Sequence, residues 1–325
     1  MSYTTLILEP ERYSPKALDV YSEFSNVKKV EKKPEDIANK ESVKTIVCRL
    51  KYHLNIEFLS MFPNLRFIVS PTTGLNHIDL DYCKANEIDI VCLKGEDGFL
   101  DSIHSTSEHN FLLMLALVRN VVPGVKSVIE SHKWDRDLFI GRELANLTLG
   151  VLGVGRIGRH MINYANAFGM SVAICDPYKD LDGLKDNTVS ICSKDELFSL
   201  ADIVSIHVDY RPENRDMISY REFKLMKPGS YFVNTSRGEL ISEEALIWAL
   251  KEGILSGAAL DVLSDEQNTK DFFNKQIFEY ARQHDNLIIT PHMGGCTLDA
   301  MMKTELFAAR KFKSIIQNRK QDQVF

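Results

Sequence analysis

The chain of 325 residues is long enough for two domains, and its 44% hydrophobic and 26% charged residues are typical of a protein with a packed core. Its net charge of −6 argues against a general nucleic-acid or membrane-surface binder, because such proteins are normally basic. The six cysteines show neither a Cys-x-x-Cys pair nor zinc-ligand spacing, so we expect no metal site. The N-terminus does not resemble a secretory signal and the apolar runs are too short to span a bilayer, so we expect a cytoplasmic protein.

Strand-like and helix-like stretches alternate through the first third of the chain. Amphipathic stretches at 16–24 and 76–86 predict helices between β-rich runs. The predicted strands are Thr4–Leu8, Thr45–Cys48, Arg66–Val69 and Ile88–Leu93. This alternation is typical of a parallel α/β fold.

A long helical pattern follows from about Ser105 to Asn120 and resumes after Pro123 as far as His132. Its apolar residues recur at helical spacing. Such a helix either bridges two domains, packs against a second subunit or lies buried in a core.

A second alternating series begins at Leu147 and predicts a complete six-stranded dinucleotide-binding sheet. A helix from Ser242 to Lys251 has Ser242 as its N-cap and Gly253 beyond its end. The final predicted helix, 297–317, is expected to pack back on the first domain, which gives domains of 1–104 plus 296–325 and of 105–295. The predicted strands are Leu147–Leu152, Ser171–Asp176, Ile203–Val208, Ser230–Asn234, Gly257–Asp261 and Leu287–Thr290.

A glycine-rich motif lies between the first of these strands and the next predicted helix. Gly153, Gly155 and Gly158 form Gly-x-Gly-x-x-Gly, with Arg156 and Ile157 as its spacer residues. Strand before and helix after are the context in which this motif binds the pyrophosphate of a dinucleotide. Asp176 ends the second strand, where a carboxylate binds ribose hydroxyls and repels a 2′-phosphate, so we expect NAD as the cofactor.

Polar residues follow the other strands of this second series, and the carboxyl ends of parallel strands share one edge of a sheet. They are His207, Asn234 to Arg237 (Thr235 among them), Asp261 and His292. Hydride transfer to a ketone needs a proton donor and a cation for the substrate carboxylate. His292 and Arg237 can supply these, and Glu266 is a candidate to stabilise the imidazolium.

Four segments resemble, in order and spacing, the motifs of the D-isomer-specific 2-hydroxyacid dehydrogenase family, which includes phosphoglycerate dehydrogenase, glycerate dehydrogenase and hydroxypyruvate reductase. They are the nucleotide loop at 151–158, the arginine motif at 233–239, the glutamate motif at 259–266 and the histidine motif at 290–295. The segment 73–79 resembles the family's first-domain loop, and 107–109 the start of its interdomain helix. The resemblance covers nearly the whole chain.

The resemblance implies a flavodoxin-like substrate domain, a Rossmann NAD-binding domain and a homodimer. It also implies that Arg237 binds the substrate carboxylate and keto oxygen, that His292 is the general acid/base and that Glu266 holds it. The backbone of Thr73 and Gly74 would bind the substrate carboxylate. Two departures from the family pattern are Gln267, where proline is usual, and Asp209-Tyr210 in a loop that the family places near the nicotinamide.

The identity of the substrate is left open by the sequence. Arg49 and Lys51 follow a predicted strand where phosphoglycerate dehydrogenases carry basic residues, so they either clamp a distal phosphate or lie in a solvated loop. Phosphoglycerate, glycerate or hydroxypyruvate, glyoxylate and a less common polyhydroxy acid all fit the motifs. The alternatives to a D-2-hydroxyacid dehydrogenase are a non-catalytic NAD(H)-sensing scaffold and a dehydrogenase of an unusual small anion such as phosphite.

Overall fold

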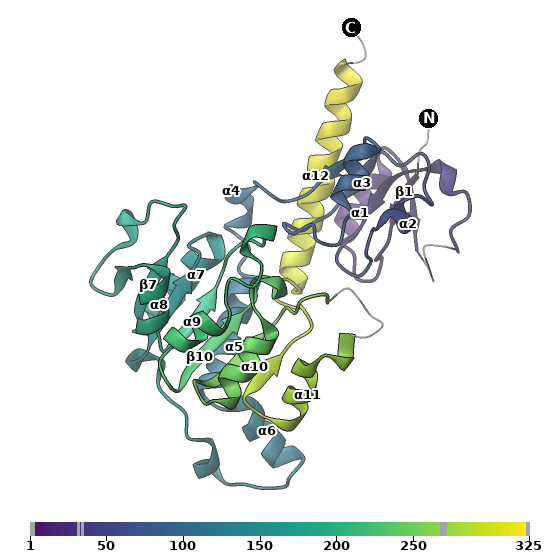
Figure 1. Cartoon of the computed structure of the whole chain (residues 1–325). Coiled ribbons are helices and arrows are strands. Elements are labelled where there is room, and N and C mark those ends of the chain that lie inside the picture. Colours follow the sequence, from purple (N-terminus) through teal and green to yellow (C-terminus); the bar gives the residue numbers. More distant parts are fainter. Residues whose placement is uncertain (1–3, 31–32, 34–35, 267–271, 323–325) are drawn as a thin grey trace. The chain divides into compact units, whose positions relative to one another are not determined.

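The chain divides into two compact units in a computed structural model, which describes residues 4–30, 33, 36–266 and 272–322 (Figure 1). Unit 1 comprises Met1–Ser102 with Cys296–Phe325, and unit 2 comprises Ile103–Gly295. The first boundary therefore lies two residues before the one expected from the sequence.

Unit 1 is built on a five-stranded parallel sheet with the order β2-β1-β3-β4-β5. This order is that of flavodoxin-like sheets and confirms the expected fold class. The chain changes direction across the sheet between β1 and β3, which makes this pair the topological switch point. The strands are β1 (Thr4–Ile7), β2 (Asn26–Lys29), β3 (Val43–Val47), β4 (Phe67–Val69) and β5 (Asp89–Val91).

The strand β2 is absent from the sequence prediction. It is a polar edge strand whose residues are exposed or half-buried, so it carries no apolar signal. Its pairing with β1 alone defines it as a strand.

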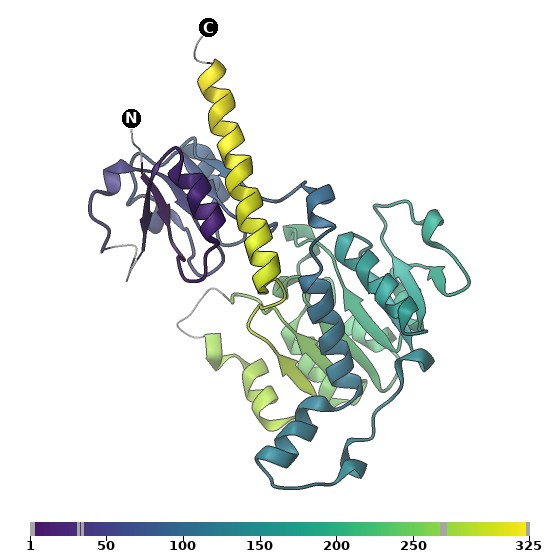
Figure 2. The ribbon, with the colours of Figure 1, turned by 180° about the vertical axis from the view of Figure 1, so that it is seen from behind.

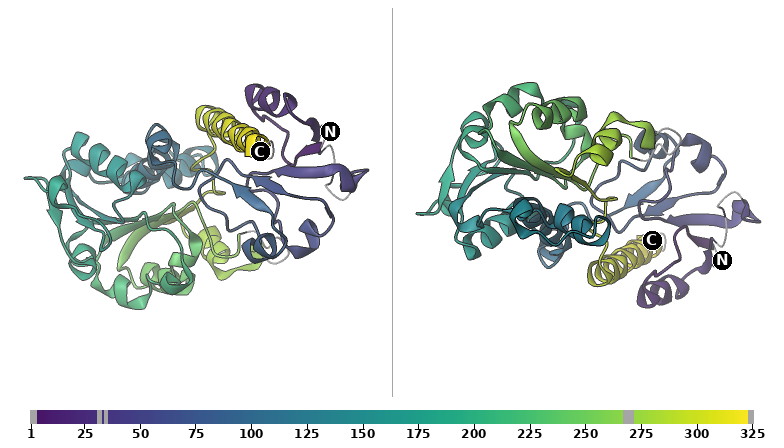
Figure 3. Two further views of the ribbon diagram at one scale, coloured as in Figure 1. Left: turned by 90° about the horizontal axis from the view of Figure 1, so that it is seen from above. Right: turned by 90° about the horizontal axis from the view of Figure 1, so that it is seen from below.

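Helices cover both faces of this sheet, as Figure 3 shows from above and below. The helix α12 is five residues longer at its end than predicted, and Figure 2 shows it lying alongside α1. Phe312 of α12 is fully buried, and its ring packs against those of Tyr21, Phe24 and Phe67. The helices of unit 1 are α1 (Pro15–Ser22), α2 (Ile56–Leu59), α3 (Leu80–Ala85), α4 (Asp97–Leu100) and α12 (Leu298–Asp322).

Unit 2 is built on a seven-stranded parallel sheet with the order β12-β11-β10-β9-β6-β7-β8. This is the order of a Rossmann sheet. The sheet has one strand more than the six predicted from the sequence, and the strand that was not predicted is the short edge strand β8. The switch point lies between β6 and β9. The strands are β6 (Thr148–Leu152), β7 (Ser171–Cys175), β8 (Val189–Ile191), β9 (Ile203–Ile206), β10 (Ser230–Asn234), β11 (Leu255–Leu260) and β12 (Leu287–Ile289).

Helices also cover both faces of the sheet of unit 2 (Figure 3). The predicted break near Pro123 occurs earlier, because α6 begins at Val121 and accommodates the proline in its first turn, where no N–H is needed. Across the described residues no single helix is long and apolar enough to cross a membrane, and only α5 and α6 together, bent by 65°, reach that length and composition. The helices are α5 (Ser105–Val118), α6 (Val121–Ile129), α7 (Arg156–Ala167), α8 (Lys194–Leu200), α9 (Tyr220–Leu225), α10 (Glu243–Lys251) and α11 (Gln276–Gln283).

Candidate active site

The glycine loop joins β6 to α7 and has the close contacts that its three glycines permit. Gly153 adopts φ +89°, and a Cβ there would lie 2.6 Å from the carbonyl oxygen of His207. A Cβ on Gly158 would lie 2.2 Å from the carbonyl oxygen of Gly153, so helix and strand pack backbone to backbone. At Gly155 a Cβ would meet no described atom within 4 Å. The N-terminus of α7, which has no side-chain cap, therefore has open space for a phosphate.

Asp176 lies directly after β7 and beside this loop. Its Oδ2 accepts a hydrogen bond from the Val154 N–H at 2.9 Å, and its Oδ1 accepts one from the Tyr178 N–H at 3.0 Å. The carboxylate thus joins the glycine loop to the turn that follows β7, the position that a ribose-binding acid needs. The side chains of the two spacer residues contact other parts of unit 2. Arg156 donates to the Ile103 carbonyl at 2.6 Å, and Ile157 packs on the core.

His292 and Glu266 come together in the structure. The Nδ1 atom of His292 forms a short contact with Oε1 of Glu266, and both side chains remain partly accessible. The other oxygen of Glu266 accepts from the Leu263 N–H at 3.3 Å. Because the carboxylate holds Nδ1, the Nε2 atom is the nitrogen left to exchange a proton with a ligand. Gln267, the departure from the family pattern, lies outside the described residues.

The loop that carries His292 is held by the carboxylate of Asp261, which follows β11. Asp261 accepts hydrogen bonds from the Thr290 hydroxyl at 2.5 Å and from the N–H groups of Met293 and Gly294 at 2.9 and 2.8 Å. His292 itself donates its N–H to the Asp261 carbonyl at 2.9 Å and adopts φ +50°. The carboxylate of Asp261 thus holds the histidine loop, and a contact of Asp261 with the cofactor at the carboxyl edge of the sheet stays a prediction.

His109 on α5 adds a fourth partner to the Asp261 carboxylate. Its Nε2 lies 3.3 Å from Asp261 Oδ1 and 3.0 Å from the Thr290 hydroxyl. Burial alone raises the pKa of Asp261, but the hydrogen bonds from His109, Thr290 and the two N–H groups outweigh it and lower that pKa below its ordinary value. The buried carboxylate is therefore charged and fixes the loop.

Arg237 follows β10 and begins a short 3-10 helix, Gly238–Leu240. Its Nη1 donates to the Ser236 carbonyl at 2.5 Å, which orients the guanidinium, and the Arg237 carbonyl accepts from Asn234 Nδ2 at 2.8 Å. A Cβ on Gly238 would lie 1.9 Å from the Leu263 carbonyl carbon. This close approach joins the arginine loop to the segment that leads to Glu266.

A buried polar network ends at His207, the residue that follows β9. The Asn110 amide donates to the Thr235 hydroxyl at 3.0 Å and accepts from the Ser205 hydroxyl at 3.0 Å, and Ser205 Oγ lies 2.9 Å from His207 Nε2. Since Ser205 gives its only proton to Asn110, it must accept from His207 Nε2–H. Burial lowers the pKa of His207 to about 3, so its ring is neutral at physiological pH. His207 and Thr235 are thus fixed on the carboxyl edge of the sheet.

The residues of unit 1 that the sequence selected lie in two loops of that unit. Thr73 and Gly74 follow β4, where the Thr72 hydroxyl donates to the Gly74 carbonyl at 2.8 Å and Ser70 Oγ lies 2.8 Å from Thr72 Oγ1. Arg49 and Lys51 follow β3, and the Arg49 side chain contacts other residues of unit 1.

Sequence reasoning missed three of the residues that build this site, His109, Asn110 and Ser205. The segment 107–109 resembles a family motif, but only the fold shows that α5 lies against β10 and β11 and brings His109 to Thr290 and Asn110 to Thr235. The available signal was a polar residue, Asn110, directly before the apolar run 111–118. A cavity of about 620 Å³ in unit 2 lies at the opposite, amino-terminal edge of its sheet, lined by Asn120, Tyr231 and Asn286 among others, away from His292. The described residues contain no cluster suited to a metal ion.

Comparison with known proteins gives a consistent result for the larger part of the chain. Residues 111–294 match the family model described as D-isomer specific 2-hydroxyacid dehydrogenase, NAD binding domain. The D-3-phosphoglycerate dehydrogenase of Methanocaldococcus jannaschii is 35% identical over 254 residues, which are 78% of this chain and 46% of that protein. The chloroplastic D-3-phosphoglycerate dehydrogenase 2 of Arabidopsis thaliana is 31% identical over 90% of this chain and 46% of its own length.

Among solved structures, the D-lactate dehydrogenase of Aquifex aeolicus in complex with NAD and lactic acid has a TM-score of 0.81 and 30% identity. The alignment covers 98% of this chain and 96% of that one. The chain thus spans less than half of the two phosphoglycerate dehydrogenases but nearly all of the D-lactate dehydrogenase.

Proposed function

Because this chain belongs to the D-isomer specific 2-hydroxyacid dehydrogenase family and is an NAD-dependent oxidoreductase of that kind, we propose that Arg237, Glu266 and His292 carry its reaction. The observation that supports this assignment is the contact between His292 Nδ1 and the Glu266 carboxylate at the carboxyl edge of the sheet. The substrate is a small D-2-hydroxy acid or the corresponding 2-keto acid.

The residues around the glycine loop fit a bound NAD. The open space at Gly155, the uncapped N-terminus of α7 and Asp176 would hold its pyrophosphate and adenosine ribose, and His207 and Thr235 lie farther along the same edge. NAD supplies the hydride acceptor or donor of the reaction. A carboxylate at Asp176 disfavours the 2′-phosphate of NADP.

The chain's own residues handle the proton and the substrate anion. In the reductive direction His292 Nε2 donates a proton to the keto oxygen, and in the oxidative direction it accepts the hydroxyl proton. Glu266 retains the Nδ1 proton and stabilises the imidazolium. Arg237 binds the substrate carboxylate and polarises the keto oxygen with the N–H groups that Ser236 does not use. Within unit 1, the backbone of Thr73 and Gly74 is the proposed binding site for a substrate carboxylate.

The test is the oxidation of NADH, followed by absorbance, with a panel of 2-keto acids and with the wild type and His292→Ala. We expect turnover of at least one 2-keto acid, a loss of about 10²–10⁴-fold in kcat for the variant, and unchanged NADH affinity by fluorescence titration. Near-wild-type turnover by His292→Ala would refute the acid/base assignment. NADH binding without turnover across the panel would favour the sensing scaffold or an unusual substrate such as phosphite.

We further propose that two copies of the chain associate through unit 2 in the cytoplasm. The helix α6 and the segment after it expose several large apolar side chains, and all six cysteines are free, as expected in a reducing compartment. Sedimentation equilibrium of the wild type and of Ile129→Glu tests the association, which predicts a dimer for the former and a monomer for the latter. Cell fractionation tests the location. The exposed side chains are Val121, Val125, Val128, Ile129, Trp134, Leu138 and Ile140.

A further inference from the structure

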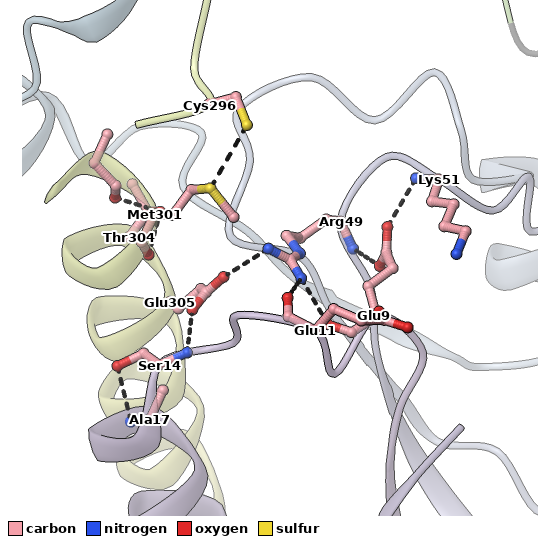
Figure 4. A network of polar contacts seen from close by, with 11 residues as sticks. Glu9, Glu11, Ser14, Ala17, Arg49, Lys51, Cys296, Met301, Thr304 and Glu305 are labelled. Carbon is pink, nitrogen blue, oxygen red and sulfur yellow. Dashed lines mark hydrogen bonds and ion pairs between the residues drawn. The ribbon is translucent and has the colours of Figure 1, made fainter. Parts of the chain in front are cut away.

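The loops after β1 and β3 form a closed polar network at the topological switch point of unit 1 (Figure 4). Ligands of flavodoxin-like sheets bind at the carboxyl ends of the strands at this point. Glu9 comes shortly after β1, and Arg49 to Lys51 come shortly after β3. The contacts of these residues therefore decide which chemical groups of a ligand can bind at the switch point.

The carboxylate of Glu9 occupies two backbone donors of the loop after β3. One oxygen accepts from the Arg49 N–H and the other accepts from the Lys51 N–H at 2.8 Å. Glu9 is buried, with 5% of its surface exposed. Two N–H groups of one turn that converge on a carboxylate are an anion-binding arrangement, and here the anion belongs to the chain itself.

The guanidinium of Arg49 is also engaged within unit 1. Its Nη2 donates to the carbonyls of Glu9 and Glu11 at 2.6 and 2.8 Å, and its Nη1 lies 3.4 Å from Oε1 of Glu305 on α12. The guanidinium also lies 5.6 Å from the centroid of the Tyr13 ring. Figure 4 shows Glu9, Glu11 and Glu305 around the side chain. The positively charged guanidinium of Arg49 thus lies between two buried acidic residues, Glu9 and Glu305.

This network adjoins the loop that we assign to the substrate carboxylate. The Leu54 N–H donates to the His77 carbonyl at 2.7 Å, and the Asp79 N–H donates to the Leu54 carbonyl at 3.0 Å. Cys48 Sγ lies 3.8 Å from His77 Nε2. The segment 49–54 therefore flanks the segment 73–79 on neighbouring strands β3 and β4. A substrate whose carboxylate binds at Thr73 and Gly74 therefore lies next to the loop after β3 that Glu9 holds.

We propose that Glu9 is a specificity-determining residue that closes this anion-binding position, so that the substrate is a 2-hydroxy or 2-keto acid whose only anionic group is its carboxylate. A distal phosphate or second carboxylate would meet two buried acids, and the N–H groups of Arg49 and Lys51 already bind Glu9. Arg49 is then a structural partner of Glu305 and not a phosphate clamp. This inference rests on the proposed function, since it concerns the substrate of the same site.

The first test compares wild-type kcat/KM for two pairs of 2-keto acids that differ by one distal anionic group, hydroxypyruvate with phosphohydroxypyruvate and pyruvate with oxaloacetate. We expect the member without the distal anion to be preferred by about tenfold or more in both pairs. A smaller ratio, or a preference for phosphohydroxypyruvate, overturns the inference while leaving the proposed function intact. Failure to reduce any 2-keto acid of the panel, with NADH still bound, removes the proposed function and the inference together.

The second test replaces Glu9 by glutamine, with Glu11→Gln as the matched control. Glu11 is exposed and contributes only its carbonyl to Arg49, so the control removes the same charge two residues away. We expect Glu9→Gln to raise the relative kcat/KM for phosphohydroxypyruvate by about tenfold and Glu11→Gln to leave it within about twofold. An unchanged ratio in Glu9→Gln, or an equal rise in both variants, overturns the inference.

A readout without turnover is the melting temperature in inorganic phosphate. Phosphate should raise it for Glu9→Gln and not for the wild type or Glu11→Gln. Equal behaviour of all three proteins overturns the inference. If Glu9→Gln does not fold, the wild-type ratios decide alone.

Discussion

The replacement of Asp261 by asparagine tests whether one buried carboxylate holds the loop of His292. The carboxylate receives Thr290, Met293, Gly294 and His109 as partners, at 2.5, 2.9, 2.8 and 3.3 Å. Three of these partners lie on Oδ1 and only the Gly294 N–H on Oδ2, so an asparagine with its oxygen at the Oδ1 position leaves the Gly294 N–H facing the new NH₂. The other three hydrogen bonds are then made to a neutral oxygen and weaken. With about 1.5–3 kcal/mol for each hydrogen bond to a charged group, we expect a loss of roughly 3–5 kcal/mol.

Thermal unfolding and steady-state turnover measure this effect together. A loss of that size lowers the melting temperature of a domain the size of unit 2 by roughly 10 °C. A shift of about 1 Å in His292 would lower kcat by about 10²-fold, while the glycine loop and NADH affinity stay intact. Thr290→Val is the matched control, because it removes one hydroxyl and leaves the carboxylate with its other partners; we expect it to lose about 1.5–3 kcal/mol, less than Asp261→Asn.

The pH dependence supplies an independent check on the same carboxylate. Because the pKa of Asp261 is lowered by folding, its stabilisation is complete above the unfolded-state pKa and disappears as the pH falls through the folded-state value. The difference in melting temperature between the wild type and Asp261→Asn should therefore be large at neutral pH and shrink as the pH falls below the ordinary aspartate pKa of 3.8. A variant that melts within about 2 °C of the wild type at neutral pH and keeps its kcat would refute the reasoning.

Three further predictions concern other residues. Arg237→Ala should raise KM for the 2-keto acid and lower kcat together, by about 10²-fold or more in kcat/KM, and unchanged kinetics would remove Arg237 from the site. Asp176→Ala should weaken NADH binding and shift the NADH/NADPH preference toward NADPH, whereas an unmoved preference in titrations would place the ribose contact elsewhere. Burial raises the pKa of Glu305 from its ordinary value of 4.5 to about 7, so the free energy of unfolding of the wild type should fall as the pH rises from 4.5 through about 7. Chemical denaturation of Glu305→Gln should show a smaller decrease over this pH range, and an equal decrease would contradict the burial argument.

The parts of the fold that the sequence predicts are those whose signal is local. The apolar run of β6, the glycines after it and the acid at the end of β7 lie within one stretch of chain, so pattern and motif agree. The strands β2 and β8 escaped prediction because each is short, lies at or near a polar edge and is defined by its pairing with a neighbour.

The sequence proposes the reactive residues of the site but does not indicate the residues that hold them. The motif positions identify Arg237, Glu266 and His292 because the chemistry restricts which side chains can serve. The roles of Asp261 and Glu9 depend on partners that lie far away in sequence, such as Gly294 for Asp261 and Lys51 for Glu9. Composition and spacing carry no information on such pairings. The same carboxylates could equally have faced a ligand.

The discontinuity of unit 1 has a consequence for the order of events during protein synthesis. The ribosome completes β1 to β5 first and then all of unit 2, and only afterwards releases α12, whose Phe312 covers Tyr21, Phe24 and Phe67. Unit 2 is contiguous and can close its sheet while the nascent chain is still attached. Until α12 is synthesised, the N-terminal part of unit 1 exposes these aromatic side chains, and a chaperone would bind the nascent chain at this surface.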